Sequence, residues 1–239
     1  MISASKKIIF LHIPKTAGTS LKKIIRSQFD SDSIFHLDPP VTTEKHISLN
    51  EKINRIELIH GHLYFGIGQQ LDIDADYFTF LREPVARVLS FWNHQNKFET
   101  GALFNEVKNG LTLQNLILSH RIPQTNNHMT RILIGNTLPH MLDGKNNAIF
   151  DRKYLDQALS NIENCFKFVG FMEHFETSVG QMLKVFNWKY GSELPILNRL
   201  NSNQSSVDEK TLDLIRKYNA LDSQLYAELL ASSTITKKQ

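Results

Sequence analysis

Short apolar runs alternate with longer amphipathic segments along this chain. Residues 7–11 (Lys-Ile-Ile-Phe-Leu) form a β-rich apolar run that ends in a turn, a pattern typical of a buried parallel strand. Residues 58–60, 77–81 and 166–171 have the same character and predict three more strands.

The segments between these runs predict helices. Residues 19–29 place Leu21, Ile24 and Ile25 at helical spacing with basic residues between them. Pro84 suits the first turn of a helix that runs to about Lys97. Helical spacing also predicts helices over residues 104–119, 127–134, 151–162, 175–186, 208–217 and 222–231, with a polar loop over residues 198–206.

Strands that alternate with helices predict an α/β fold with a central parallel sheet flanked by helices on both faces, a three-layer arrangement like that of P-loop proteins. The length of 239 residues suits one domain over residues 1–239. Ligands of such sheets bind at the carboxyl ends of the strands. The loops after Leu11, His60 and Leu81 are therefore expected on one rim.

Composition adds few constraints. The net charge of +3 is too small to indicate bulk nucleic-acid binding. The single cysteine, Cys165, cannot form an internal disulfide and is expected to be a buried structural thiol. The apolar run before Pro14 is too short for a signal peptide or a membrane span, and no later run reaches about 18 residues. We expect a cytoplasmic protein with no transmembrane segment.

The loop after the first strand has the parts of a phosphate-binding site. It reads Pro14-Lys15-Thr16-Ala17-Gly18-Thr19-Ser20 and leads into a predicted helix, whose first N–H groups and dipole favour an anion. Gly18 allows close backbone approach, Lys15 adds positive charge, and three hydroxyls add donors. The alternative is a purely structural role, in which Thr19 or Ser20 only caps the start of the helix.

This loop is not a Walker A motif. That motif places lysine after its last glycine and directly before the Ser/Thr that binds magnesium. Here Lys15 precedes Gly18, and the chain has no Gly-Lys-Ser/Thr. The order argues against magnesium-dependent NTP hydrolysis.

A second candidate anion site follows the third predicted strand. Arg82 comes directly after that strand and can form a fork of hydrogen bonds to a phosphate. Ser90 lies eight residues later, about two helical turns along, so it can face the same rim. Alternatively, Arg82 forms a structural salt bridge and Ser90 is a surface residue, while Arg87 pairs with Glu83 at i,i+4.

These two segments together resemble the paired donor-binding motifs of sulfotransferases that use 3′-phosphoadenosine 5′-phosphosulfate (PAPS). Ile-Pro-Lys-Thr-Ala-Gly-Thr-Ser followed by Leu-Arg-Glu-Pro-Val-x-Arg-x-x-Ser-x-Trp is similar to the carbohydrate branch that includes the heparan sulfate and uronyl 2-O-sulfotransferases. The resemblance covers residues 8–92 well and extends more loosely to Phe186.

The resemblance implies a role for each matching position. Lys15, Thr16, Ala17, Gly18, Thr19 and Ser20 would hold the 5′-phosphosulfate of PAPS. Arg82 and Ser90 would hold its 3′-phosphate. Arg199, in a late loop with a weak match, is the best basic candidate for a further contact to the nucleotide. The product would be adenosine 3′,5′-bisphosphate, and no metal is expected.

His60-Gly61-His62 lies at the end of the second predicted strand. The 2-O-sulfotransferase branch carries a similar His-Gly-His, whose first histidine takes the proton of the acceptor. An imidazole suits this role because its ordinary pKa lies near neutrality. His60 is therefore the candidate base and His62 an orienting or acceptor-binding residue. A zinc site and a purely structural pair stay open as alternatives; His12, on the same rim, is expected to pack behind the loop.

The predicted reaction is in-line transfer of a sulfuryl group from PAPS to an acceptor hydroxyl, with Lys15 neutralising charge at the bridging oxygen. The acceptor is expected to be a glycan or another small molecule. A nucleotide kinase-like phosphoryl transferase and a non-catalytic nucleotide- or glycan-binding module are the rival functions.

Residues 98–147 are expected to form a helical insertion on the acceptor side. Their basic side chains would either meet an acidic sugar or lie on a solvated surface: Arg121, His128, Arg131, His140 and Lys145.

Overall fold

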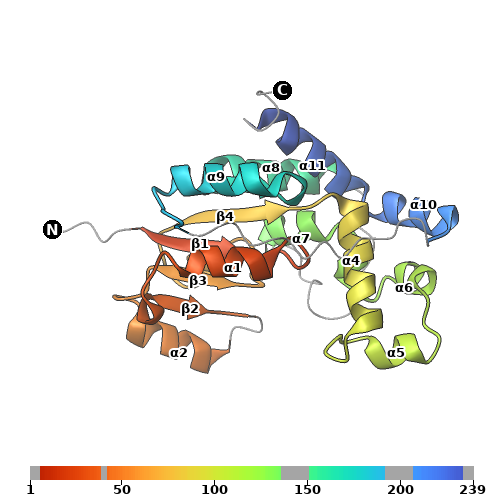
Figure 1. The fold of residues 1–239 in the computed structure, drawn as a ribbon, viewed down its shortest axis with the longest axis horizontal. Helices are drawn as coiled ribbons and strands as arrows, with labels where there is room; N and C mark the ends of the chain where they lie inside the picture. The colour runs from red at the N-terminus through yellow and green to blue at the C-terminus, as the bar shows by residue number, and fades with distance from the viewer. Residues whose placement is uncertain (1–5, 39–41, 136–150, 192–206, 234–239) are drawn as a thin grey trace. The chain divides into compact units, whose positions relative to one another are not determined.

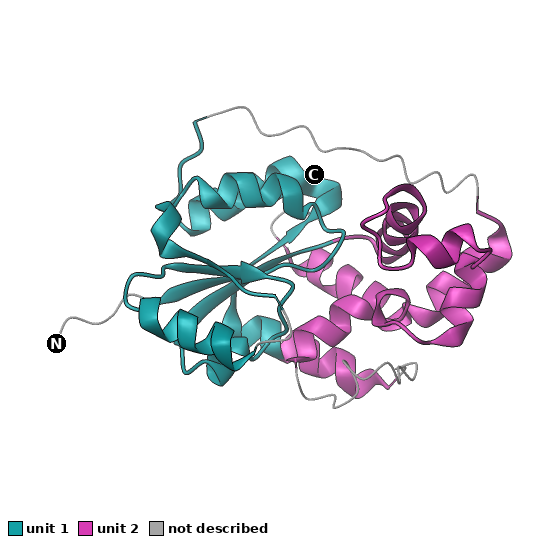
Figure 2. Ribbon diagram, turned by 90° about the horizontal axis from the view of Figure 1, so that it is seen from below, with its two compact units in different colours: residues 1–81, 161–197 teal, residues 82–160, 198–239 magenta. Residues whose placement is uncertain are grey.

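A computed structural model describes residues 6–38, 42–135, 151–191 and 207–233. The chain divides into two compact units, each formed by two stretches of sequence (Figure 2). We call residues 1–81 and 161–197 the sheet unit, and residues 82–160 and 198–239 the helical unit. The prediction of one domain over residues 1–239 stays a prediction.

The sheet unit contains five strands in the order β2-β3-β1-β4-β5, and every neighbouring pair is parallel. The strands are β1 (Lys7–Leu11), β2 (Ile34–His36), β3 (Leu58–Gly61), β4 (Ala75–Leu81) and β5 (Phe166–Phe171). Helices lie on both faces of the sheet (Figures 1 and 2): α1 (Gly18–Arg26), α2 (Thr43–Lys52), α3 (Ile67–Gln70) and α9 (Phe175–Val185). Helix α8 (Arg152–Cys165) leads from the helical unit into β5.

Successive side chains of the central strands point to opposite faces of the sheet. On one face, Phe10 and Phe78 stack with ring centroids 4.8 Å apart. They belong to a buried cluster that also contains apolar residues of α1 and α9. On the other face, the Tyr77 hydroxyl accepts a hydrogen bond of 2.7 Å from the Gly68 N–H of α3. Because both faces are covered, the strands are nearly continuous apolar runs.

The predicted α/β fold with a central parallel sheet is confirmed, and all four predicted strands are present. The sequence did not reveal β2, because three residues are too few to show a period. It did not reveal α2 either, because Leu49 is the only buried residue of that helix. The signal that was available for α2 is Thr42, whose side chain accepts a hydrogen bond from the Lys45 N–H as a helix cap.

The helical unit carries α4 (Pro84–Lys97), α5 (Phe104–Lys108), α6 (Leu113–Ser119), α7 (His128–Ile134), α10 (Glu209–Tyr218) and α11 (Ala220–Ser232). The helix predicted over residues 104–119 is two helices, because Gly110 between them has φ 96°, outside the helical region. One core joins α4, α6 and α10: Val85, Val88, Leu89, Leu113, Ile117, Leu212 and Ile215.

Asp222 is a fully buried carboxylate of α11 that organises the start of α7. It accepts hydrogen bonds from the N–H groups of Met129 and Thr130 and from the Thr130 hydroxyl. Burial raises the pKa of Asp222, and the nearby charge of Arg87 and these hydrogen bonds work against that rise.

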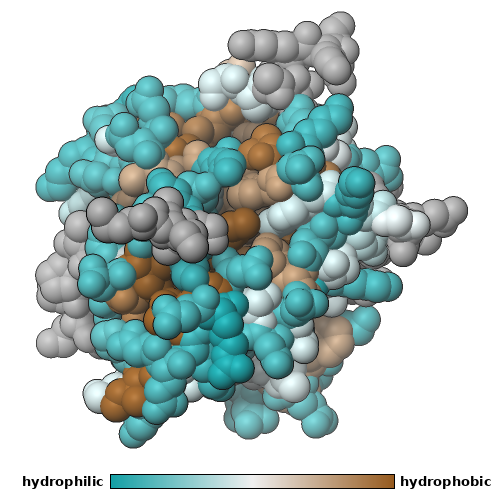
Figure 3. All heavy atoms as spheres, turned by 90° about the vertical axis from the view of Figure 1, so that its left-hand side faces the viewer, coloured by the Kyte–Doolittle hydropathy of each residue, from teal (hydrophilic) through white to brown (hydrophobic). Residues whose placement is uncertain are grey.

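None of the described helices combines the length and apolar character that crossing a membrane requires. The end of the molecule from which β1 and β4 start carries mostly hydrophilic side chains around smaller apolar patches (Figure 3). The carboxyl ends of the strands point the other way, and the predicted chemistry lies there.

Candidate active site

The anion loop, residues 14–20, connects β1 to α1 in the sheet unit. Two of its residues have left-handed backbone conformations, Lys15 with φ 73° and Ala17 with φ 65°. Such values are uncommon outside glycine and mark a tightly constrained turn. The buried Thr16 fixes this turn, because its hydroxyl donates a hydrogen bond of 2.7 Å to the Ile13 carbonyl. Thr16 therefore holds the loop's shape.

In the described ranges of the chain, no side-chain hydrogen bond caps the N-terminus of α1. Its N-cap residue is Ala17, which makes no capping side-chain hydrogen bond, and no acidic residue lies in the first turn. The interpretation that Thr19 or Ser20 is merely a cap is therefore wrong. The first amide groups of an α-helix have no partner within it, so they point into the loop as donors for an anion.

Gly18 is needed for a reason that the sequence did not reveal. A Cβ atom at this position would lie 1.8 Å from Nε2 of His12. The imidazole of His12 therefore packs directly against the first residue of α1. His12 is 7% exposed, and neither of its ring nitrogens has a hydrogen-bond partner among the residues that the structure describes.

Four histidines and one aspartate meet at the carboxyl ends of β1, β2 and β3, and we call them the histidine cluster: His12, His36, Asp38, His60 and His62. The rings of His12 and His62 stack with centroids 4.7 Å apart. The rings of His36 and His60 have centroids 4.8 Å apart. Because His12 also touches Gly18, the cluster continues directly into the anion loop.

Asp38 connects the two halves of the cluster. Its Oδ1 accepts a hydrogen bond of 2.6 Å from the His62 N–H and lies 3.4 Å from Nδ1 of His62. Its Oδ2 lies 2.9 Å from Nε2 of His36. The backbone accommodates this because Gly61 passes close to the Leu37 carbonyl, where a Cβ atom would lie 1.8 Å from the oxygen.

Burial shapes the charges of this cluster. It lowers the pKa of His60 to about 4, and electrostatic interactions with His36, Lys22 and Arg26 add to this effect. It lowers the pKa of His12 to about 3, assisted by the charge of His62.

His62 and Asp38 are more exposed than His12 and His60, and their pKa values are shifted as well. Burial lowers the pKa of His62, although the neighbouring Asp38 opposes the shift. For Asp38, burial raises the pKa, but the hydrogen bonds and charges of His62 and His36 outweigh it and the net shift is downward. Near neutral pH, His60 is therefore uncharged and Asp38 is ionised.

The sequence did not single out His36 or Asp38. The available signal was positional: both stand at the end of a short apolar run, where a parallel strand places its last side chains beside those of its neighbours. In the described part of the chain, no three His, Cys, Asp or Glu side chains are grouped so as to hold a metal ion.

Arg82 and Ser90 belong to the helical unit and are both buried. Ser90 lies on α4, whose start is capped by the Glu83 carboxylate accepting hydrogen bonds from the N–H groups of Val85 and Ala86. Arg87 is fully buried and donates a hydrogen bond of 2.7 Å to the Gln124 carbonyl. Burial lowers the pKa of Arg87 to about 10.

The basic candidates for acceptor binding have different environments. Arg121 is partly exposed and pairs with Glu106. His128 and Arg131 are buried, and Arg131 donates hydrogen bonds to the backbone and side chain of Asn126. A solvated surface is thus the wrong description for these two. His140, Lys145 and Arg199 lie outside the described residues.

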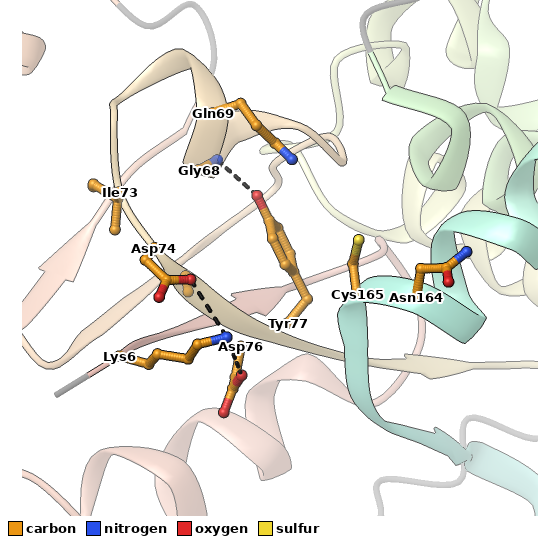
Figure 4. Close-up of a pocket in the computed structure, with 10 residues that line it drawn as sticks. Lys6, Gly68, Gln69, Ile73, Asp74, Asp76, Tyr77, Asn164 and Cys165 are labelled. Atoms are coloured by element: carbon orange, nitrogen blue, oxygen red, sulfur yellow. Dashed lines mark hydrogen bonds and ion pairs between the residues drawn. The ribbon is translucent and has the colours of Figure 1, made fainter.

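A pocket of about 300 Å³ lies where β4 begins, at the opposite end of the strands from the histidine cluster (Figure 4). It is lined by Asp74, Asp76, Tyr77 and Cys165, among others. Lys6 lies 3.4 Å from Asp74 and 3.7 Å from Asp76. Two carboxylates against one lysine do not suit an anionic nucleotide, so this pocket is not the predicted donor site.

The sequence matches the profile of a family described as "Sulfotransferase family" over residues 1–230. Mouse (Mus musculus) galactose-3-O-sulfotransferase 3 is 23% identical over 238 residues, which cover 92% of this chain and 54% of that protein. The chain thus spans about half the length of this curated relative. A solved mouse sulfotransferase complexed with PAP has a TM-score of 0.43 and 13% identity, and the match covers 89% of this chain and 64% of the other.

Proposed function

The chain belongs to the sulfotransferase family, and from this premise we propose that it transfers a sulfuryl group from PAPS to a hydroxyl group of a carbohydrate. One observation carries the proposal. The anion loop and the histidine cluster adjoin at the carboxyl ends of neighbouring parallel strands, through the contact of His12 with Gly18. An anion site beside an uncharged imidazole is what transfer from an anionic donor to an alcohol requires.

The anion loop is the proposed site for the 5′-phosphosulfate. The uncapped amide groups of α1 supply directed donors, and Lys15 supplies a full charge. Thr19 and Ser20 add hydroxyls in the first turn of α1. Arg82 and Ser90 are the proposed ligands of the 3′-phosphate, as the family resemblance implies.

The proposed reaction is a direct in-line displacement. An oxygen of the acceptor alcohol attacks sulfur, and the bond from sulfur to the bridging oxygen of the donor breaks. Adenosine 3′,5′-bisphosphate leaves with the bonding electrons, and Lys15 stabilises the charge that develops on the bridging oxygen. His60 takes the proton of the alcohol, so the products are a sulfate ester, the bisphosphate and an imidazolium.

The depressed pKa of His60 is compatible with this role. A base must be unprotonated before the reaction, and burial together with nearby cations ensures this at neutral pH. The donor carries several negative charges, which favour the imidazolium when they lie nearby. Donor binding is therefore expected to raise the pKa of His60 toward the working pH and to strengthen it as a base.

The acceptor proposed for the first assays is a galactose-containing glycan. This choice rests on the name of the mouse relative, which specifies the 3-hydroxyl of galactose. Residues 98–147 remain the proposed acceptor-side segment.

Measuring transfer of labelled sulfate from PAPS to a panel of glycans tests the proposal. Lys15→Ala and His60→Ala are expected to lower kcat by about 10² to 10⁴-fold, the usual contribution of such groups. Lys23→Ala, in the last turn of the same helix, is the matched control and is expected to leave kcat unchanged. Near-normal turnover of His60→Ala would show that His60 is not the base. Tighter binding of ATP than of adenosine 3′,5′-bisphosphate would favour a phosphoryl transferase instead.

A further inference from the structure

The contacts of His36 place an unusual constraint on the protons of the histidine cluster. Its Nε2 lies 2.9 Å from Oδ2 of Asp38. Its Nδ1 lies 3.1 Å from the carbonyl oxygen of His60 and 3.3 Å from Nδ1 of the same residue. One ring edge of His36 thus meets both the backbone and the side chain of the proposed base.

The chemistry of these partners restricts where protons can lie. A carboxylate and a carbonyl only accept hydrogen bonds, so bonds to both require a proton on each nitrogen of His36, which makes it an imidazolium. The Nδ1–H of His36 then faces Nδ1 of His60, which must accept a hydrogen bond from it. Neutral His60 has a single ring proton, and in this state that proton is on Nε2.

A neutral His36 produces the opposite arrangement. Its remaining proton stays on Nε2, where Asp38 accepts it, and Nδ1 then carries a lone pair. That lone pair can accept a hydrogen bond from Nδ1–H of His60. The proton of His60 is then on Nδ1, and its Nε2 is free to accept a proton from an alcohol.

We propose that His36 is a positioning residue that determines which nitrogen of His60 can act as the base, and that Asp38 holds His36 in this role. Protonated His36 keeps His60 in the tautomer that has no free Nε2, and neutral His36 releases it. The kinetic consequence rests on the function proposed above, whereas the coupling of the two imidazoles does not.

Other charged groups act on the same pair and must stay constant in any test. They come from α1, from α2 and from the ends of β2 and β3: Lys22, Arg26, Asp38, Lys45 and His62. Of these, Lys45 donates a hydrogen bond of 2.6 Å to the carbonyl of Asp38. The variants below leave all five unchanged.

Nitrogen NMR of the full chain with ¹⁵N-labelled histidine tests the proposal directly, because protonated and unprotonated ring nitrogens have distinct shifts. As the pH is raised, we expect the ring proton of His60 to move from Nε2 to Nδ1 with the same midpoint as the deprotonation of His36. His36→Asn places an uncharged amide near the position of Nδ1 and is expected to abolish this exchange. His46→Asn, which removes an imidazole from α2, is the matched control and is expected to leave it intact.

Kinetics provide the second measurement. His36→Ala is expected to lower kcat about tenfold, the equivalent of one hydrogen bond, with KM for PAPS unchanged. Compared with His36→Ala, His36→Asn is expected to restore most of kcat. In its pH profile, the fall of kcat on the acid side is expected to move to lower pH, while His46→Asn behaves as wild type.

The two measurements separate the possible failures. If the ring proton of His60 stays on the same nitrogen while His36 loses its proton, the inference is overturned, even if sulfate transfer is measured. If the NMR experiment shows the coupling but no acceptor receives sulfate, the proposed function is overturned and the inference about His36 still holds.

Discussion

Lowering the pH from 7 to 5 is expected to destabilise the sheet unit, because His12 is buried as a neutral imidazole. Its two ring nitrogens have no hydrogen-bond partner within the described part of the chain. Burial, assisted by the charge of His62, lowers its pKa to about 3. An unfolded histidine titrates near 6.5. Between these values the unfolded chain binds a proton that the folded chain does not, so the free energy of unfolding falls as the pH drops from about 6.5 toward 3.

The size of the effect follows from these two pKa values. At pH 5 the unfolded imidazole is about 1.5 pH units below its ordinary pKa, while folded His12 is still uncharged. At about 1.4 kcal/mol per unit, His12 accounts for a loss of about 2 kcal/mol relative to pH 7. His60 adds a loss of the same sign, because its pKa is also lowered.

Urea unfolding followed by tryptophan fluorescence can isolate the contribution of His12. The chain has two tryptophans, and Trp188 packs against Phe186 in the sheet unit. A Trp92→Phe background leaves Trp188 as the single reporter of that unit. In this background, the free energy of unfolding of His12→Leu is expected to fall by about 2 kcal/mol less than that of the parent between pH 7 and 5, since leucine carries no titrating group.

The matched control is His46→Leu, because His46 lies half-buried on α2 outside the histidine cluster. It is expected to lose as much stability as the parent. Equal losses in the parent and in His12→Leu would refute the reasoning, since they would mean that His12 is protonated in the folded protein at pH 5.

Three further predictions concern other parts of the molecule. Gly18→Ala is expected to destabilise the sheet unit by about 1 to 3 kcal/mol in urea unfolding, because its Cβ would overlap His12, whereas Gly180→Ala on α9, with open space at its Cβ, is expected to be neutral or to stabilise by up to about 1 kcal/mol. Asp222→Ala is expected to lower the free energy of unfolding of the helical unit by about 3 to 5 kcal/mol, read from Trp92 fluorescence in a Trp188→Phe background, because it leaves three buried donors without their acceptor and removes a negative charge near the buried guanidinium of Arg87. Arg82→Ala is expected to weaken the binding of adenosine 3′,5′-bisphosphate at least tenfold in calorimetry. The binding of adenosine 5′-phosphosulfate, which lacks the 3′-phosphate, is expected to stay unchanged, and equal weakening for both ligands would contradict the assigned contact.

Local patterns were enough to predict much of the fold. The apolar runs at β1, β4 and β5 are long enough to show a buried strand, and Pro84 marks the start of α4. The anion loop was also predictable, because a glycine, a lysine and hydroxyls before a helix form a local signal. The lack of any cap at Ala17 is a backbone property that these residue types do not reveal.

The rest of the candidate site depends on contacts between distant segments. His36 and Asp38 are separated from His60 by 24 and 22 residues, and only the pairing of β2 with β3 brings them together. No periodicity in the sequence predicts that register, since β2 has three residues. The same holds for His12, whose close contact with Gly18 depends on how the loop folds back over the strand.

The conformation of the anion loop has a consequence for protein engineering. Lys15 and Ala17 both have left-handed backbone conformations, which are unfavourable by about 1 kcal/mol or more for residues other than glycine. A redesign guided by stability alone would place glycine or asparagine at these positions and an acidic residue in the first turn of α1. Each change would relax the folded chain, and the acidic residue would occupy the amide groups that an anionic ligand needs. In this loop, sequences optimised for thermal resistance and sequences optimised for ligand binding are expected to diverge, so a consensus-based stabilisation of this chain is best confined to residues outside 14–20.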